Sequence, residues 1–301
     1  MKTRSLPGGQ LKALLHKVGV LSYAQALRAS LRRTRQSARM RFFPSATMHP
    51  HRLVFIAGLP KSGTTWLENL VAAVPGYHTL VPYDPQHLLP EHILDPGLLT
   101  HVPARGNFIL KTHMEGRPQG VEALRNHGIP TVVMVRDLRD QCVSRYYHVL
   151  SSPEHRPHDF YRSSDQSVGI SHCLEVSVTE YADWVRNWMP VLAEDDSGLF
   201  MLVRYEDLLA DTKGMFSKVL EHFATAIPEH EVDAIIEEVA RAAREGADLE
   251  ERLRKGNTFR SGQVGEWREH FSPEDIERFK AAANDVLVSL AYEKDDTWQA
   301  R

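Results

Sequence analysis

An apolar stretch that runs directly into a glycine-bounded turn constrains the fold of this chain more than any other feature. Residues 53–57 are all apolar, and residues 58–66 then read Gly-Leu-Pro-Lys-Ser-Gly-Thr-Thr-Trp. We expect a buried strand, a tight turn and a helix that begins near Thr64. Such a turn directs several backbone N–H groups to one point at the positive end of a helix dipole, which is a geometry that binds phosphate.

The position of the lysine distinguishes this turn from a nucleoside triphosphate site. Gly58 and Gly63 have the spacing of a P-loop, but Thr64 stands where a Walker A loop has its lysine. The lysine of this turn is Lys61, inside the loop. None of the predicted strands ends in a free acid that would hold magnesium. The sequence therefore predicts a phosphate cradle for a different kind of ligand.

From residue 53 onward, apolar strands alternate with helical stretches, which predicts an α/β fold with a parallel sheet. The predicted strands are apolar almost throughout, as expected for burial on both faces, and comprise residues 53–58, 107–112, 131–136 and 199–205. The predicted helices comprise residues 64–74, 121–126, 140–150, 176–193, 213–223, 229–244 and 273–291. We expect loops at 75–106, 151–172 and 245–258, over the carboxyl edge of the sheet where open α/β folds bind ligands.

Charged and titratable residues follow two of these strands. Lys111 and His113 end the second strand and, being two residues apart, point the same way. A neutral histidine accepts a proton from a hydroxyl, and a lysine holds anionic oxygens. Arg136 ends the third strand, and its guanidinium suits a phosphate, with the Ser144 hydroxyl as a further donor. The alternative for Arg136 is an ion pair with one of the two aspartates that follow it, at positions 137 and 140.

Four segments in this order resemble cytosolic-type sulfotransferases, which use 3′-phosphoadenosine 5′-phosphosulfate (PAPS). Residues 60–66 resemble the 5′-phosphosulfate loop, and residues 136–147 resemble the 3′-phosphate motif of the family. Residues 205–208 read Tyr-Glu-Asp-Leu, similar to a conserved family segment, and residues 259–267 resemble the FRKGxxGDW motif. The resemblance implies a P-loop-like, three-layer α/β/α domain with a central parallel sheet, over residues 51–301.

The resemblance also implies roles for individual residues. Lys111-Thr112-His113 matches the lysine and the base histidine of the family, so the implied catalytic residues are His113, Lys61 and Lys111. The implied PAPS-binding residues come from the two loops, the 3′ motif and two aromatic side chains: Lys61, Ser62, Gly63, Thr64, Thr65, Trp66, Arg136, Ser144, Tyr205, Phe259, Arg260, Ser261 and Gly262. Two departures from the family are Ser261, which replaces a lysine, and Glu115-Gly116, which replace the usual proline after the histidine.

The sequence thus predicts a PAPS-dependent sulfotransferase that needs no metal. It would move a sulfuryl group to a hydroxyl of a small molecule, lipid or carbohydrate, with His113 as base. Two alternatives stay open, a small-molecule kinase of the same fold and a non-catalytic nucleotide-binding module. His155, His158 and His172 match no zinc pattern and are interpreted as loop residues. The usual family dimer is not predicted, because its Thr-Val pair is absent from residues 268–273.

Composition excludes several other classes. The net charge of −3 gives no indication of a nucleic-acid partner, and 301 residues are enough for one large domain. The two cysteines, Cys142 and Cys173, form no disulfide framework, which favours a reducing, cytoplasmic location. The sequence contains no apolar run of the length that a transmembrane helix requires.

The first 50 residues form a basic N-terminal extension. No Asp or Glu precedes Glu68, whereas residues 1–52 contain eleven Lys and Arg. Three interpretations stay open: an amphipathic helix in peripheral contact with a membrane, an Arg-rich transit peptide, or a helix that packs on the domain.

Overall fold

The structure, a computed structural model, describes residues 48–80, 94, 99, 102–153, 155–245 and 262–300. The three interpretations of the basic extension concern residues outside this part of the chain, and they stay predictions. Within it, none of the helices is both long enough and hydrophobic enough to span a membrane.

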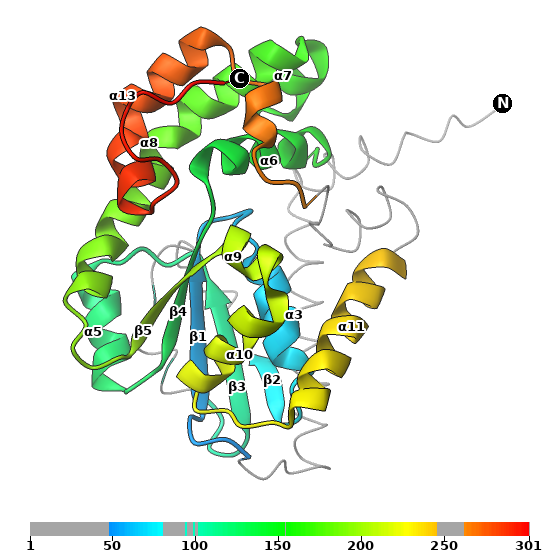
Figure 1. Cartoon of the computed structure of the whole chain (residues 1–301), viewed down its shortest axis with the longest axis vertical. Helices are drawn as coiled ribbons and strands as arrows, with labels where there is room; N and C mark the ends of the chain where they lie inside the picture. Colours follow the sequence, from blue (N-terminus) through cyan, green and yellow to red (C-terminus); the bar gives the residue numbers. More distant parts are fainter. Residues whose placement is uncertain are drawn as a thin grey trace, which may run out of the picture.

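Five parallel strands form the central sheet, in the order β2-β3-β1-β4-β5 (Figure 1). They are β1 (Leu53–Gly58), β2 (Tyr77–Leu80), β3 (Asn107–Thr112), β4 (Thr131–Val135) and β5 (Phe200–Arg204). All residues of β1 and β4 are buried, as their unbroken apolar sequences predict.

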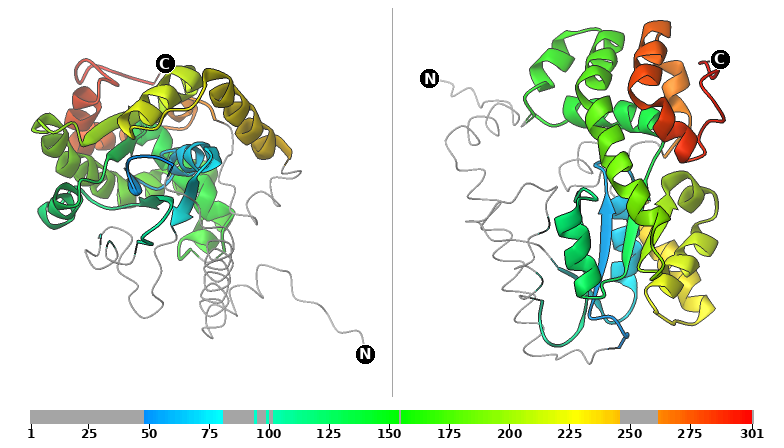
Figure 2. Two further views of the ribbon diagram at one scale, coloured as in Figure 1. Left: turned by 90° about the horizontal axis from the view of Figure 1, so that it is seen from below. Right: turned by 90° about the vertical axis from the view of Figure 1, so that its left-hand side faces the viewer.

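Helices cover both faces of the sheet, which confirms the predicted three-layer architecture (Figure 2). One face packs against α3 (Thr64–Ala73), α10 (Thr212–His222) and α11 (Glu229–Glu245). The other packs against α5 (Pro118–Asn126), α6 (Leu138–Leu150) and α8 (Gln166–Ala193). The alternation of side chains along β1 divides the core in the same way: Val54 and Ile56 face the first group, and Phe55 and Ala57 face the second.

The order of the strands creates a topological switch point beside β1. From β1 the chain builds β2 and β3 on one side and then crosses to β4 and β5 on the other, so the direction of the strand order reverses beside β1. Open α/β sheets bind ligands outside such a switch point. The shorter elements α7 (His158–Ser163), α9 (Tyr205–Ala210) and η1 (Glu266–Glu269) and the longer α13 (Pro273–Ser289) complete the described fold. Figure 1 shows α6, α7 and α13 beyond the carboxyl ends of the strands.

The four predicted strands are confirmed, and the start of α13 follows its sequence closely. The Ser272 hydroxyl accepts a hydrogen bond from the Asp275 backbone N–H, and the Asp275 carboxylate accepts one from the Ser272 N–H. Pro273 occupies the first turn, where its missing N–H costs nothing. Local chemistry alone specifies this helix start.

Two of the predicted loops are wrong in part. The segment 75–106 contains β2, and the segment 151–172 contains α7 and the first turns of α8. The start of α8 includes Gly169 and several polar residues that form helices poorly. Ile170 and Leu174 are nevertheless completely buried there. Packing against the core therefore decides the conformation, as it does for most helices in proteins.

A buried arginine connects the start of α6 to the end of the chain. Arg139 is only 2% exposed, and it donates hydrogen bonds to both carboxylate oxygens of Asp137 and to Glu293. Its guanidinium lies 4.1 Å from the ring centre of Trp267 and 4.6 Å from that of Trp298. Both carboxylates therefore depend on a single cation for their charge balance.

Replacing Arg139 with methionine should lower the free energy of unfolding by about 3–5 kcal/mol, because the buried carboxylate of Asp137 and the partly buried carboxylate of Glu293 would lose their cationic partner. Arg186→Met is the matched control. Arg186 also pairs with two carboxylates, of Asp183 and Asp285, but at the exposed surface, where the loss should stay below about 1 kcal/mol. Urea denaturation measures both variants, and equal losses would contradict the burial argument.

Candidate functional site

The turn after β1 forms a cradle of backbone N–H groups. Lys61 and Gly63 have left-handed φ values of 72° and 88°, and Gly63 is the N-cap of α3. The N–H groups of Gly63, Thr64 and Thr65 have no hydrogen-bond acceptor among the described residues, and the first turn of α3 contains no acidic side chain. The open helix terminus therefore retains the donors and the partial positive charge that bind an anion.

Side chains from three directions fix this turn in place. The buried Ser62 hydroxyl donates to the Leu59 carbonyl at 2.7 Å, and Gln141 Nε2 donates to the Pro60 carbonyl at 2.8 Å. Tyr205, the first residue of α9, packs so tightly on Gly63 that a Cβ added to the glycine would lie 2.6 Å from the tyrosine ring. Gly63 is thus required both for its positive φ and for this contact.

His113 lies just beyond the end of β3, and its ring is held by β1. Nδ1 lies 2.6 Å from the backbone carbonyl oxygen of Gly58. Because a carbonyl only accepts hydrogen bonds, Nδ1 carries the proton in this contact. In the neutral ring Nε2 then keeps the lone pair, which makes Nε2 the basic atom.

Lys111 reaches the same connection between β1 and α3 from the neighbouring strand. Its ammonium donates to Thr65 Oγ1 at 3.1 Å and forms an ion pair with Glu68 at 3.0 Å. The structure thus brings Lys111 and His113 to the two ends of one turn, at Thr65 and Gly58. The ion pair between Lys111 and Glu68 follows from no pattern in the sequence.

Arg136, at the end of β4, joins two loops. Its Nη1 donates to the Lys61 carbonyl at 3.4 Å and its Nη2 to the Gln263 carbonyl at 3.2 Å, while its guanidinium lies 4.6 Å from the ring centre of Tyr205. The side chain is 7% exposed, and its buried Nε has no partner in the described part of the chain. Asp137 pairs with Arg139 instead, so the structure gives no support to the alternative of an Arg136–Asp137 pair.

Ser144 adds a second unused donor on α6. Its side chain is 8% exposed, and its hydroxyl makes no hydrogen bond to any described residue. Among the residues that the structure describes, Ser144 thus has an unused hydroxyl donor on the same segment as the buried, unpartnered Nε of Arg136.

Asp140, in α6, anchors the loop that precedes η1 and contains Gln263. Its carboxylate accepts the backbone N–H of Gly265 at 2.6 Å and that of Trp267 at 3.0 Å. Burial raises the pKa of this carboxyl group, and the neighbouring Asp137 raises it further. Gly262 begins the described part of this loop with a φ of 67°. Three of the residues predicted to bind PAPS lie outside the described part of the chain: Phe259, Arg260 and Ser261.

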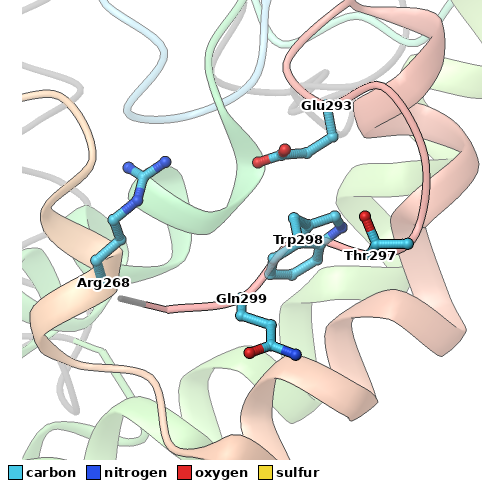
Figure 3. A pocket seen from close by; sticks show the side chains of 5 residues that line it. All are labelled: Arg268, Glu293, Thr297, Trp298 and Gln299. Atoms are coloured by element: carbon cyan, nitrogen blue, oxygen red, sulfur yellow. The ribbon is translucent and has the colours of Figure 1, made fainter.

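A separate cavity of about 630 Å³ lies between η1 and the C-terminal segment (Figure 3). It is lined by Arg268, Glu293, Thr297, Trp298 and Gln299. None of the predicted site residues contributes to it, and we assign it no role.

Of the three histidines interpreted as loop residues, His155 lies in a bend before α7, whereas His158 and His172 lie in helices. His158 begins α7 and contacts the Val149 carbonyl through Nδ1, and His172 lies in α8 beside the Tyr161 hydroxyl. The part of the chain that the structure describes contains no group of three or more His, Cys, Asp or Glu side chains suited to a metal ion.

Several residues around the site escaped prediction. Asp140 and Gln141 lie within the segment 136–147, but their targets are backbone groups of distant loops, which no pattern reveals. Trp184 and Trp188 contact the segment after β3. Their four-residue spacing in a predicted helix indicates a shared face, and this signal was available in the sequence.

Comparisons with known proteins agree with this geometry. A profile of the family described as "Sulfotransferase domain" matches residues 51–290. Cytosolic sulfotransferase 10 of Arabidopsis thaliana is 25% identical over 263 residues, which cover 78% of each chain. The solved structure of mouse sulfotransferase SULT7A1 complexed with PAP has a TM-score of 0.61 at 17% identity, and covers 81% of this chain and 86% of that one. Retinol dehydratase in complex with androsterone and inactive cofactor PAP has a TM-score of 0.54 at 19% identity, with 78% and 80% covered. The two solved structures support the P-loop-like fold.

We predict that neutral His113 carries its proton on Nδ1, because the Gly58 carbonyl accepts from that atom. His222 is the internal comparison: its Nε2 contacts the Thr131 carbonyl at 3.1 Å, so it should be the opposite tautomer, and burial lowers its pKa. Long-range ¹H–¹⁵N correlation spectra at alkaline pH distinguish the two forms. A proton on Nε2 of His113 would contradict the assignment.

Proposed function

The chain belongs to the sulfotransferase domain family, and from this premise we propose that it transfers a sulfuryl group from PAPS to an acceptor hydroxyl. The acceptor is a small molecule, a lipid or a carbohydrate. The two solved relatives described above were crystallised with PAP, the desulfated form of that donor.

The buried, incompletely paired guanidinium of Arg136 is the observation that carries this proposal. A donor with phosphates at both its 5′ and 3′ positions needs two anion sites at a fixed separation. The cradle around Gly63 suits the first, and Arg136 with the Ser144 hydroxyl suits the second. Arg136 also donates to the Lys61 carbonyl, so the second site is built onto the loop that forms the first. A nucleotide without a 3′-phosphate would leave Arg136 Nε and the Ser144 hydroxyl unused.

The residues of the 5′ side fit a phosphosulfate group. The N–H groups of Gly63, Thr64 and Thr65 have no other acceptor in the described chain, and the Ser62 hydroxyl fixes the turn that presents them. Lys61 lies within this turn. We assign its ammonium to the oxygen that joins phosphate to sulfur, where negative charge grows as the bond breaks. A contact that strengthens in this way accelerates the reaction.

His113 and Lys111 supply the remaining chemistry. PAPS provides, when bound, a sulfuryl group that leaves PAP behind after transfer. The acceptor hydroxyl loses its proton to Nε2 of His113, and its oxygen bonds to sulfur as the bond from sulfur to the phosphate oxygen breaks. Lys111, held by Thr65 and Glu68, places a positive charge beside the cradle for the sulfuryl oxygens. We assign Trp66 to stacking on the adenine ring. Its own ring lies edge-on to that of Tyr205, with the two ring centres 6.0 Å apart.

Mass spectrometry tests the reaction directly. Pools of hydroxyl-containing small molecules, lipids and glycans are incubated with the protein and PAPS, and a product heavier by one sulfuryl group identifies the acceptor class. A parallel reaction with ATP and magnesium tests the kinase alternative. Phosphorylated products, with no sulfated ones, would overturn the proposal.

PAP should stabilise the protein against heat much more than AMP or ADP, because only PAP has a 3′-phosphate for Arg136 and Ser144. Charge-assisted hydrogen bonds contribute about 1.5–3 kcal/mol each, so we expect PAP to bind at least about 10-fold more tightly. Thermal shift titrations measure this difference. In an Arg136→Met variant the preference for PAP should shrink. Equal shifts for all three nucleotides in the native protein would reject the donor.

His113→Ala should reduce turnover by about 10²–10⁴-fold, the usual effect of removing a general base. Its affinity for PAP should stay close to that of the native protein, since the base acts on the acceptor. His222→Ala is the matched control, because His222, the last residue of α10, also contacts a strand carbonyl, but that carbonyl belongs to Thr131 at the amino end of β4. Retention of most activity by His113→Ala would assign the base to another residue.

A further inference from the structure

Two buried indoles of α8 hold the backbone that follows β3. Trp184 Nε1 donates to the His113 carbonyl and Trp188 Nε1 donates to the Met114 carbonyl, both at 3.1 Å. The two tryptophans are 2% and 1% exposed, and their ring centres are 6.0 Å apart. Their spacing of four residues places both N–H groups on one face of the helix.

The segment cannot easily move away from this face. Gly116 lies so close to α8 that a Cβ there would be 2.7 Å from the Asn187 carbonyl oxygen. Met114 N–H donates to Thr112 Oγ1, which turns the chain away from the strand direction. Residues 113–116 are therefore held against one turn of α8 by two hydrogen bonds and a close backbone contact.

The backbone of His113 relies on the hydrogen bond from α8, whereas the residues of β3 before it are held by the sheet. β3 ends at Thr112, whose register partner in β1 is Ala57. The His113 carbonyl lies outside that ladder, and the Trp184 indole is the donor that satisfies it. The ring of the same residue is bound to the Gly58 carbonyl at 2.6 Å. One residue is thus fixed by β1 through its side chain and by α8 through its backbone.

We propose that Trp184 is a positioning residue for His113. This inference rests on the proposed function, in which Nε2 of His113 takes the acceptor proton. Trp184 does not touch the base atom. Trp184 instead holds the backbone carbonyl of His113. In this way it determines where Nε2 of His113 lies relative to the turn at Gly63, which is proposed to bind the donor.

The expected effect follows from the sensitivity of proton transfer to geometry. In Trp184→Phe the aromatic ring remains, but the His113 carbonyl loses its donor and the segment shifts to find another. A displacement of about 1 Å at a reacting group can cost on the order of 10²-fold in rate. We expect kcat to fall about 10–100-fold, while the KM for PAPS and the affinity for PAP stay unchanged.

Trp188→Phe is the matched control. It removes the same kind of indole-to-carbonyl hydrogen bond from the same helix, one residue further from the base. Its melting temperature should fall about as much as that of Trp184→Phe, but its kcat should stay within about threefold of the native value. Equal losses of kcat in the two variants would show that the indoles only stabilise the fold, and a native kcat in Trp184→Phe would also overturn the proposal.

A second measurement keeps the test independent of folding and of the proposed reaction. The His113 ring signals in NMR spectra report its tautomer and pKa without any substrate. Trp184→Phe should change these signals and Trp188→Phe should not, even if the native protein fails to use PAPS. Unchanged His113 signals in Trp184→Phe would reject the positioning role on their own.

Discussion

The guanidinium of Arg136 is the point at which the loops of this site are joined. It extends from the end of β4, lies over the ring of Tyr205 at the start of α9, and donates to carbonyls of the turn after β1 and of the loop before η1. It is buried, and no carboxylate in the described chain forms an ion pair with it. Burying a charge with incomplete pairing destabilises the fold. A bound anion would offset that cost, so the same feature that weakens the free protein favours a ligand.

The surrounding acids are arranged so that they do not neutralise Arg136. Asp137 is occupied by Arg139, and Asp140 is occupied by two backbone N–H groups at the start of η1. Glu206 accepts the Asp137 N–H and the Tyr292 hydroxyl. Each carboxylate has its own donors, which are close in sequence for Asp137 and distant for Asp140 and Glu206. The five residues 136–140 thus contain one arginine that serves the fold and one that stays available for a ligand.

The sequence predicts those parts of the molecule that depend on local chemistry. The buried strands, the turn at Gly63 and the capping box at Ser272 follow from apolar runs, glycine spacing and N-cap preferences. Residues that end parallel strands necessarily meet at one edge, which explains why Lys111, His113 and Arg136 lie at the same edge of the sheet, as their sequence positions predict. β2, α7 and the start of α8 depend on burial against distant elements and were missed. Contacts such as those of Glu68 and Asp140 depend on how helices are placed on the sheet, and a single sequence carries no record of that placement.

The two sides of the proposed site are held by different physical interactions. On the donor side the contacts are ionic or charge-assisted, through Arg136 and Asp140. On the proposed acceptor side, His113 makes two contacts with neutral groups, through its ring to the Gly58 carbonyl and through its own carbonyl to the indole of Trp184. PAPS carries several negative charges, and its arrival would change the electrostatic potential throughout the crevice. Neutral, buried hydrogen bonds respond far less to such a change than ion pairs do. In the proposed reaction, these two neutral contacts would hold His113 in place while the negatively charged donor binds beside it.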